Sequence, residues 1–312
     1  MTDRKIVILA TGGTIAGLAG NAAGQPGYKA AQVHIDALVA AVPSLQGRSL
    51  VCEQVAQIDS KDMSFEIWRT LVLRCSHWLA QGDVAGVVIT HGTDTLEETA
   101  FFLQSVLGPA KPVVLTCAMR PANALYPDGP QNLMDAVTVA GTEGAMGVVA
   151  VCAGTIHSAA DVTKQHSARL DAFTSGEAGP IGVVRDGAVQ VFRPWPEPSG
   201  REPRAVVQLP SAQDWPRVEI VISHAQASGA LIDALVAQGV RGLVVAGTGN
   251  GTVHCAMDAA LGRADAAGVS VLRASRCAQG GVSARADDAF PGAQSLSPVK
   301  ARIALMLRLM LG

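Results

Sequence analysis

Residues 6–17 read IVILATGGTIAG, and this stretch decides the fold that the sequence predicts. An aliphatic run too short for a stable lone helix is closed by two glycines, which is typical of a buried parallel strand ending in a tight turn. The turn delivers Thr14 at the carboxyl end of the strand, the edge where open α/β sheets bind ligands. Glycines there let a substrate approach backbone N–H groups. Taken alone, this turn favours the interpretation of Thr14 as an ordinary turn residue whose hydroxyl makes a local hydrogen bond.

A second stretch, GVVITHGTDTLEE at residues 86–98, repeats the pattern of the first. A short aliphatic run again precedes a polar turn with a glycine, and a helical pattern follows. Two strands of one sheet would therefore each end in a loop that presents a threonine, Thr14 in the first and Thr93 in the second. Asp94 and Thr95 have a second interpretation, as the N-cap of the helix that follows.

The first two thirds of the chain alternate strand patterns with helix patterns. Short loops between such elements favour a parallel, right-handed, doubly wound sheet. The sequence predicts an N-terminal α/β domain over residues 1–193, with strands at 6–10, 50–58, 87–89, 113–116 and 147–152 and helices at 33–42, 65–79, 132–140 and from about 95. Ser64 is the expected N-cap of the second helix. Residues 18–30 and 157–164 are predicted as loops.

A proline-rich stretch divides the chain. Residues 194–217 hold six prolines and little periodicity, which is typical of a linker. Beyond it, residues 218–312 predict a smaller α/β domain with strands at 218–222, 242–246 and 269–272 and helices at 228–238, 251–267 and 297–311. The predicted fold class is therefore α/β, with a doubly wound, mainly parallel sheet in the larger N-terminal domain.

Composition argues against several classes of protein. The 312 residues carry a formal net charge of −2 and only 4% are aromatic, so nucleic acid is not an expected partner. No apolar stretch approaches the ~20 residues that cross a bilayer and no signal-peptide pattern opens the chain, so we expect a cytoplasmic protein without membrane partners. The six cysteines stand singly, and adjacent residues such as His254 and Cys255 do not easily turn to one ion, so no metal site is predicted.

Thr93, Asp94 and Lys164 together supply a chemistry that a lone threonine lacks. A threonine hydroxyl is a poor nucleophile at neutral pH, so it needs a base within reach and a group that holds that base. A desolvated lysine loses its proton more readily, while Asp94 would orient it or bind the cationic amine of a substrate. Backbone N–H groups of the glycine turns could stabilise an oxyanion. Such a set suits amide hydrolysis without a metal, although a lone charge such as Lys164 is ordinarily solvated surface.

Several motifs, in order along the chain, resemble the bacterial-type L-asparaginases of the asparaginase/glutaminase family. They are ATGGTIAG at 10–17, IDSKDM at 58–63, ITHGTDTLEETAFFL at 89–103, KPVVLTCAMRP at 111–121, DGPQNLMDAV at 128–137, DVTK at 161–164 and GTGNG at 247–251. The resemblance implies conversion of L-asparagine to L-aspartate and ammonia through a threonyl acyl-enzyme, with no metal or cofactor. It also implies self-association as a dimer of dimers.

The resemblance assigns catalytic roles to five residues. Thr14 matches the primary nucleophile of the family, and Tyr28 matches its partner on a neighbouring loop. Thr93, Lys164 and Asp94 match a second triad that activates the nucleophile or a water molecule.

Substrate binding is assigned in the same way. Ser60 and Asp94 match positions that hold the α-carboxylate and the α-amine of the substrate. Asn250 matches a residue that reaches in from the second domain of a neighbouring subunit, so a complete site would need at least a dimer.

Two positions depart from the family pattern. Lys61 stands where glutamine is usual, and Arg285 is the best match to a glutamate on the carboxy-terminal loop. Two cations there would repel an α-ammonium group and attract a carboxylate, which favours an amide whose amine is acylated or absent, or one with an extra carboxylate. A loop shifted by two or three residues would instead give the acidic role to Asp287 or Asp288 and leave Lys61 in solvent.

Two other classes of function stand beside amide hydrolysis. A non-catalytic amino-acid-binding protein on the same scaffold is one, since a fold does not fix a function, but the full set of catalytic residue types speaks against it. A dinucleotide-binding enzyme is the other, but residues 11–17 lack the G-x-G-x-x-G pattern. Asparagine is the single substrate that the sequence favours, with D-asparagine, glutamine and amine-modified analogues as alternatives.

Overall fold

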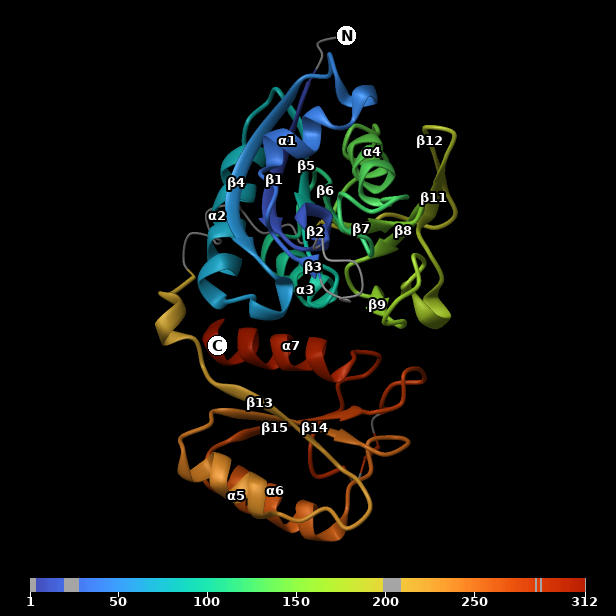
Figure 1. Ribbon diagram of the computed structural model, residues 1–312. Helices are drawn as coiled ribbons and strands as arrows, with labels where there is room; N and C mark the ends of the chain where they lie inside the picture. Colours follow the sequence, from blue (N-terminus) through green and yellow to red (C-terminus); the bar gives the residue numbers. More distant parts are fainter. Residues whose placement is uncertain (1–3, 20–27, 199–208, 284, 287, 312) are drawn as a thin grey trace. The chain divides into compact units, whose positions relative to one another are not determined.

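The computed structural model describes residues 4–19, 28–198, 209–283, 285–286 and 288–311 (Figure 1). The chain divides into two compact units, Met1–Leu209 and Pro210–Gly312. Residues 199–208, in the stretch predicted as a linker, lie outside the described part. Over the residues described, no helix combines the length and the apolar character that crossing a membrane requires.

Unit 1 is built on an eight-stranded sheet with the order β12-β11-β8-β7-β6-β5-β1-β4. Its strands are β1 (Lys5–Gly12), β4 (Leu50–Ile58), β5 (Val84–Thr90), β6 (Val113–Thr116), β7 (Val148–Cys152), β8 (Thr155–Ser158), β11 (Gly182–Arg185) and β12 (Ala188–Val191). The pairs β4–β1, β1–β5, β5–β6 and β6–β7 are parallel, whereas the pairs β7–β8, β8–β11 and β11–β12 are antiparallel. The predicted mainly parallel sheet is confirmed.

Helices cover both faces of this sheet (Figure 1). They are α1 (Ile35–Ala40), α2 (Phe65–Leu79), α3 (Leu96–Leu107) and α4 (Gly129–Ala140). On one face, Ile6 and Ile8 of β1 share a buried cluster with Ile35 of α1 and Leu133 of α4. On the other face, α2 packs on β5 and α3 packs on β7. The doubly wound arrangement follows, because fully buried parallel strands need apolar cover on both sides.

Local sequence explains where several helices begin and end. Ser64 accepts a hydrogen bond from a backbone N–H in the first turn of α2, so the predicted N-cap is confirmed. α1 is shorter than predicted, since it ends at Ala40 and a 3-10 turn (Pro43–Leu45) follows. α4 begins at Gly129, earlier than predicted, because Pro130 fits a first helical turn, where its missing N–H would have no partner in any case.

The region after β7 differs most from the prediction. Residues 157–164 were expected to form a loop, but His157 lies in β8 and the two-residue strand β9 (Thr163–Lys164) pairs antiparallel with β10 (Phe173–Thr174). β11 and β12 form a hairpin at the sheet edge. These strands are short and largely exposed along β12, so they lack the continuous apolar runs that marked the parallel strands.

Residues 18–30 also hold structure that the sequence did not predict. β2 (Leu18–Ala19) and β3 (Tyr28–Lys29) pair antiparallel, so the described ends of this predicted loop form a small ribbon. Residues 20–27 lie outside the described part.

Unit 2 contains a three-stranded parallel sheet with the order β13-β14-β15. Its elements are β13 (Val218–Ile222), β14 (Gly242–Gly247), β15 (Ser270–Ser275), α5 (Ala230–Ala237), α6 (Cys255–Ala266) and α7 (Pro298–Leu311). α5 and α6 cover one face and α7 the other (Figure 1). α6 begins later than predicted, because Thr248 and Thr252 bond to each other through their backbones and close a tight loop before it.

Candidate active site

Three loops meet at the carboxyl ends of β1, β4 and β5. Gly13 has a φ of 80°, and a Cβ atom on it would overlap the backbone of Gly92. A Cβ atom on Gly92 would overlap the side chain of Ser60 in turn. Glycine is therefore required for this close approach. Thr14 and Thr93 directly follow the two glycines and are 5% and 7% exposed, so the sequence-predicted threonines lie on loops in contact.

Lys164 connects the second threonine to its acidic neighbour. Its Nζ donates hydrogen bonds of 2.8 Å to Oγ1 of Thr93 and 2.6 Å to Oδ1 of Asp94. The Lys164 side chain is 18% exposed, whereas that of Asp94 is 51% exposed and within reach of a solute. α3 has its N-cap at Thr95, as the capping interpretation predicted, but no side chain caps the helix, so the Asp94 carboxylate does not serve as a cap. The structure instead brings a hydroxyl, an amine and a carboxylate into one connected group.

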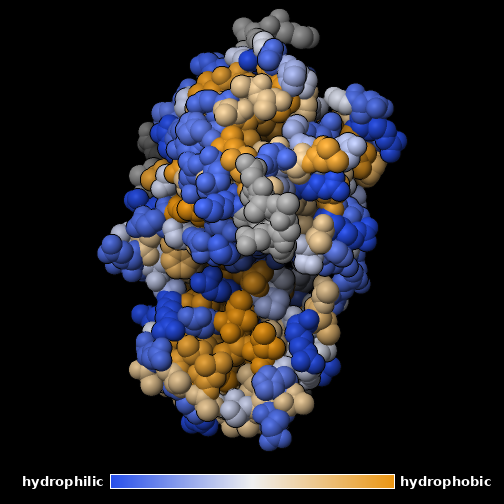
Figure 2. Space-filling model, viewed as in Figure 1, coloured by the Kyte–Doolittle hydropathy of each residue, from blue (hydrophilic) through white to orange (hydrophobic). Residues whose placement is uncertain are grey.

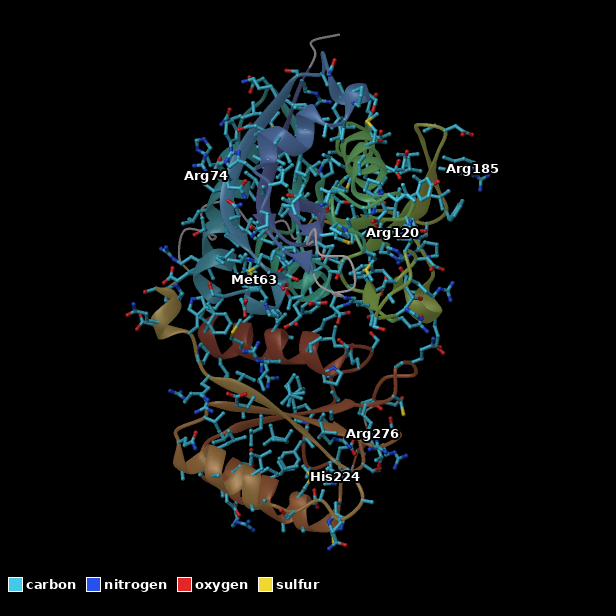
Figure 3. All side chains as sticks on the ribbon, viewed as in Figure 1. Met63, Arg74, Arg120, Arg185, His224 and Arg276 are labelled. Atoms are coloured by element: carbon cyan, nitrogen blue, oxygen red, sulfur yellow. The ribbon has the colours of Figure 1, made fainter. Side chains whose placement is uncertain are left out.

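Ser60 is fixed against the turn that carries this group. It opens a 3-10 turn (Ser60–Asp62), and its Oγ accepts a 3.1 Å hydrogen bond from the backbone N–H of Asp94. Its carbonyl oxygen accepts a 2.7 Å bond from Oγ1 of Thr95. The β4 loop and the β5 loop are therefore joined independently of Lys164. Met63, labelled in Figure 3, belongs to the same β4 loop, and Arg120 belongs to the loop after β6.

Lys61 turns toward its own neighbours in sequence. Its Nζ forms ion pairs with Asp59 at 3.0 Å and with Asp62 at 3.1 Å, and its side chain is 61% exposed. Hydrogen bonds to Asp59 and Asp62 raise the pKa of Lys61, so its charge persists at neutral pH. Since two carboxylates flank one ammonium group, Lys61 is not an uncompensated cation beside Ser60.

A buried polar chain supports the β5 loop from behind. Nδ1 of His91 lies 2.7 Å from the Gly92 carbonyl, which can only accept, so Nδ1 carries the proton. Nε2 then accepts from Oγ1 of Thr99 at 2.9 Å, and the Trp68 indole donates to the same Oγ1 at 2.8 Å. Burial lowers the pKa of His91 to about 4, which keeps the ring neutral. This directed chain fixes the peptide between Gly92 and Thr93.

Two further contacts position Lys164. Oε2 of Glu97, in the first turn of α3, accepts a 3.2 Å hydrogen bond from the backbone N–H of Lys164. Asp161, three residues before Lys164, accepts hydrogen bonds from Ser158 at 2.6 Å and from Arg193 at 2.5 Å. The backbone N–H of Lys164 and the segment just before it are thus tied to neighbouring elements.

The segment after Thr14 is held by the loop that follows β6. The backbone N–H of Ala122 donates to the Gly17 carbonyl at 2.9 Å, and the Asn123 amide bonds both backbone groups of Ala19, at 2.6 and 3.2 Å. Tyr28 pairs with Ala19 through its backbone. The role predicted for the Tyr28 side chain lies outside the described part of the structure.

The two remaining predicted residues lie in unit 2. The Asn250 amide clamps the backbone of Ser283, accepting from its N–H at 2.7 Å and donating to its carbonyl at 3.3 Å. Arg285 is exposed, and its backbone N–H donates to Asp288 at 2.7 Å. Asp288 also pairs with Arg273. Asn250 therefore contacts the loop that carries Arg285. The Asp288 carboxylate binds the backbone of that loop and Arg273. Asp287, the other acidic candidate, lies outside the described residues.

Sequence reasoning missed the supporting residues. His91, Thr99, Glu97 and Arg193 were not singled out, because a hydrogen bond between distant segments leaves no mark in spacing or periodicity. His91 carried the only available signal, a polar residue directly between a buried strand and a glycine turn. Glu97 carried no comparable signal, since its bond to the Lys164 backbone spans 67 positions.

Both halves of the chain match known protein families. Residues 5–197 match the description "Asparaginase, N-terminal", and residues 217–312 match "Glutaminase/Asparaginase C-terminal domain". The chain belongs to the asparaginase family. The "L-asparaginase 2" of Escherichia coli is 39% identical to this asparaginase-family chain over 98% of the chain and 88% of that protein. The "L-asparaginase 2" of Bacillus subtilis is 37% identical over 98% of the chain and 82% of that protein.

Other members of the asparaginase family carry different names. A "Glutaminase-asparaginase" of Pseudomonas fluorescens is 39% identical over 98% of the chain and 86% of that protein. A solved structure described as "Probable Cytoplasmic L-asparaginase from Campylobacter jejuni" superimposes with a TM-score of 0.88 and 38% identity, covering 98% of this chain and 95% of that one. The eight-stranded sheet and the smaller second unit are therefore the fold of the asparaginase family.

Proposed function

We propose that the chain hydrolyses the side-chain amide of L-asparagine to L-aspartate and ammonia through a threonyl acyl-enzyme. One observation carries the proposal: Nζ of Lys164 lies 2.8 Å from Oγ1 of Thr93 and 2.6 Å from Oδ1 of Asp94. Hydroxyl, base and orienting carboxylate are the parts that activate a threonine or a water molecule. Relatives named L-asparaginase at 37% and 39% identity support this choice of substrate.

The chemistry divides between the two threonines. In the first half-reaction Oγ1 of Thr14 attacks the amide carbon and backbone N–H groups of the glycine turns hold the oxyanion. The proton of the Thr14 hydroxyl is passed to the leaving nitrogen, which departs as ammonia. In the second, with the Lys164 amine neutral, a water molecule passes its proton through the Thr93 hydroxyl to Lys164 and attacks the acyl carbon. Oγ1 of Thr14 regains a proton as the ester C–O bond breaks. Asp94 holds Lys164 in place and stabilises the ammonium that forms.

Substrate binding follows from the groups around this pair. Because Oγ of Ser60 already accepts the Asp94 N–H, its own O–H remains to donate to the α-carboxylate of the substrate. The second oxygen of Asp94, on a side chain that is 51% exposed, would accept the α-ammonium group. Lys61 is paired with two carboxylates, which supports a substrate with a free amine over an acylated one.

Self-association forms a further part of the proposal. We infer that Asn250 and the loop with Arg285 complete the site of a neighbouring copy, and that the assembly is a dimer of dimers. Support comes from aliphatic side chains of unit 2 that stay in solvent, Ile222 at 57% and Leu231 at 59% exposure, and from the apolar surface that Figure 2 shows on this unit. Light scattering on the purified chain tests the assembly, and a monomer with full activity would contradict it.

A cytoplasmic location is the last part of the proposal. It is supported by the Campylobacter jejuni relative, which is described as a "Probable Cytoplasmic L-asparaginase", and by exposed free thiols at Cys255 and Cys277, which persist in reducing compartments. A Haemophilus influenzae relative named periplasmic favours the other compartment. Fractionation of the source cells decides between them.

The test is ammonia release from L-asparagine, D-asparagine, L-glutamine, N-acetyl-asparagine and succinamic acid. Thr14→Ala and Thr93→Ala are compared with Thr138→Ala, a control on α4 whose hydroxyl bonds only its own helix backbone. Turnover of L-asparagine that both site variants lose and the control keeps would support the proposal. Turnover of only the amine-modified amides would keep the mechanism and overturn the choice of substrate. No ammonia from any of the five would overturn the asparaginase assignment and leave an amidohydrolase of another substrate or a binding protein.

A further inference from the structure

Two buried thiols that the proposed reaction does not use lie in contact beneath the site. Cys117 directly follows β6 and Cys152 ends β7, and their sulfur atoms are 3.3 Å apart. They are 1% and 4% exposed, and both are free thiols. Thr116 pairs with Val151 in the parallel ladder, so the next residues along, Cys117 and Cys152, face each other.

This placement fits the geometry of a disulfide. Neighbouring strands lie about 4.8 Å apart, within the Cα separation of roughly 4.4–6.8 Å that disulfides span. A sulfur–sulfur bond is about 2.05 Å long, so the two sulfur atoms need to approach by only about 1.3 Å. Side-chain rotation with a small shift of the strand ends would supply that approach.

The backbone around the pair leads to the catalytic loops. Asn132 bonds the Cys117 carbonyl at 2.9 Å and the Ala153 N–H at 3.0 Å, which braces both strand ends. Ala118 follows Cys117 in the loop after β6. Gly129 lies so close to Ala118 and to Ile15, the residue after Thr14, that a Cβ atom on it would contact both. The same loop bonds the backbone at Gly17 and Ala19. A shift at Cys117 would therefore be passed on to the Thr14 segment.

The surroundings of the two thiols slow their oxidation. The hydrogen bond with Cys152 and burial raise the pKa of the Cys117 thiol, Asp128 adds to that rise, and Lys164 opposes it. Since the thiolate is the reactive species, oxidation of this pair is slow.

We propose that Cys117 and Cys152 form a reversible disulfide in the folded protein under peroxide, and that this bond lowers amidase activity. The second half of the statement rests on the proposed function, and the first half does not. One thiol loses its proton and its sulfur attacks hydrogen peroxide, breaking the O–O bond and giving a sulfenic acid and water. The second thiol attacks the sulfenic sulfur and releases water. Two thiols and one peroxide thus give one disulfide and two water molecules.

The test uses a Cys255→Ser/Cys277→Ser background, because these exposed thiols would react first. The folded protein is treated with hydrogen peroxide, alkylated under denaturing conditions and digested, and the peptides are identified by mass spectrometry. We expect a linked pair of peptides containing Cys117 and Cys152, lost in Cys152→Ala and in Cys117→Ala. Absence of the linked pair, under treatment that fully oxidises the exposed thiols of the parent chain, would overturn the disulfide whatever the enzyme does.

Activity is read from the same samples. We expect peroxide to remove at least half of the ammonia release from L-asparagine, dithiothreitol to restore it, and either alanine variant to keep its activity through the treatment. Dithiothreitol separates the disulfide from methionine oxidation, which it does not reverse under these conditions. A linked pair with unchanged activity would overturn the regulatory half alone. If the untreated protein releases no ammonia, the proposed function fails, and the peptide result still decides the disulfide.

Discussion

The carboxyl ends of the two parallel sheets carry polar loops that are built in opposite ways. In unit 1 the loops bring reactive side chains together, with Lys164 bonded to both Thr93 and Asp94. In unit 2 the polar side chains serve the backbone, since Asn250 clamps Ser283 and Ser275 bonds the Gly249 carbonyl at 2.7 Å. The proposed chemistry therefore lies at the first edge, whereas the described polar side chains of the second edge hold loop backbone in place. Substitutions at the first edge should therefore lower the reaction rate far more than substitutions at the second edge.

Loss of the base should have the largest effect. Lys164→Met removes the amine from Thr93 and Asp94 and should lower kcat/KM for L-asparagine by roughly 10³-fold or more, because members of a catalytic triad act as a unit. Lys111→Met is the control, since that lysine bonds the Gln81 carbonyl away from these loops, and should stay within about twofold of the parent. Asn250→Ala should stay well above Lys164→Met in steady-state assays of ammonia release. Equal losses in the two would break the comparison between the edges.

Acid should weaken unit 1 through its buried histidine. Burial lowers the pKa of His91 to about 4 in the folded chain, below its usual 6.5, so the unfolded chain binds more protons between these values. The free energy of unfolding is therefore highest above pH 6.5, and it falls by about 3 kcal/mol as the pH decreases to 4. Urea unfolding at pH 7, 5.5 and 4.5 measures it, with His91→Asn as the variant that cannot titrate. Identical pH slopes for parent and variant would remove His91 from the account.

A smaller loss is expected where a carboxylate positions the base. Glu97→Ala frees the backbone N–H of Lys164 and should lower kcat about tenfold with KM little changed, because the amine is less well placed. Glu97→Gln keeps an oxygen that can accept this bond and should recover most of the rate. Glu66→Ala removes a first-turn carboxylate from α2 instead and controls for the helix dipole. An alanine variant as active as the parent would show that Glu97 does not position Lys164.

The smallest effect is expected at Lys61. Lys61→Gln removes an exposed charge that is already paired with Asp59 and Asp62, so KM for L-asparagine should change by less than about twofold. Steady-state kinetics with L-asparagine and succinamic acid measure the preference for a free amine. A tenfold gain for L-asparagine in the variant would mean that Lys61 reaches the substrate and sets its specificity.

The fold could be predicted where a strand appears in the sequence as a short aliphatic run before a turn. Residues 6–9 and 87–89 are buried aliphatic runs before glycine turns, and both lie in the parallel sheet. The hairpin of β11 and β12 was missed, although Asp186 and Gly187 form its turn at φ values of 52° and 75°, a pairing that favours hairpins. Its strands mix partly buried with exposed residues and contain no apolar run, so the pattern of hydrophobic residues did not predict this hairpin.

The candidate site was predictable in its reactive residues and not in their support. Thr14 and Thr93 follow strand-ending glycines, so their place at one sheet edge follows from the chain itself. Lys164 lies 71 positions from Thr93, and only the fold brings Nζ to the hydroxyl. The Glu97 carboxylate and the His91 ring act through bonds whose partners depend on register and helix placement. Such contacts depend on distances of a few ångströms, which cannot be read from the order of residues.

The most direct test of the account is whether L-asparagine and L-aspartate β-methyl ester pass through one acyl-enzyme. Hydroxylamine competes with water for such an intermediate, so the ratio of β-hydroxamate to aspartate should be the same from both substrates, with neither product formed by Thr14→Ala. Ratios that differ between the substrates, or hydroxamate from the Thr14→Ala variant at the parent rate, would contradict a threonyl acyl-enzyme at this site.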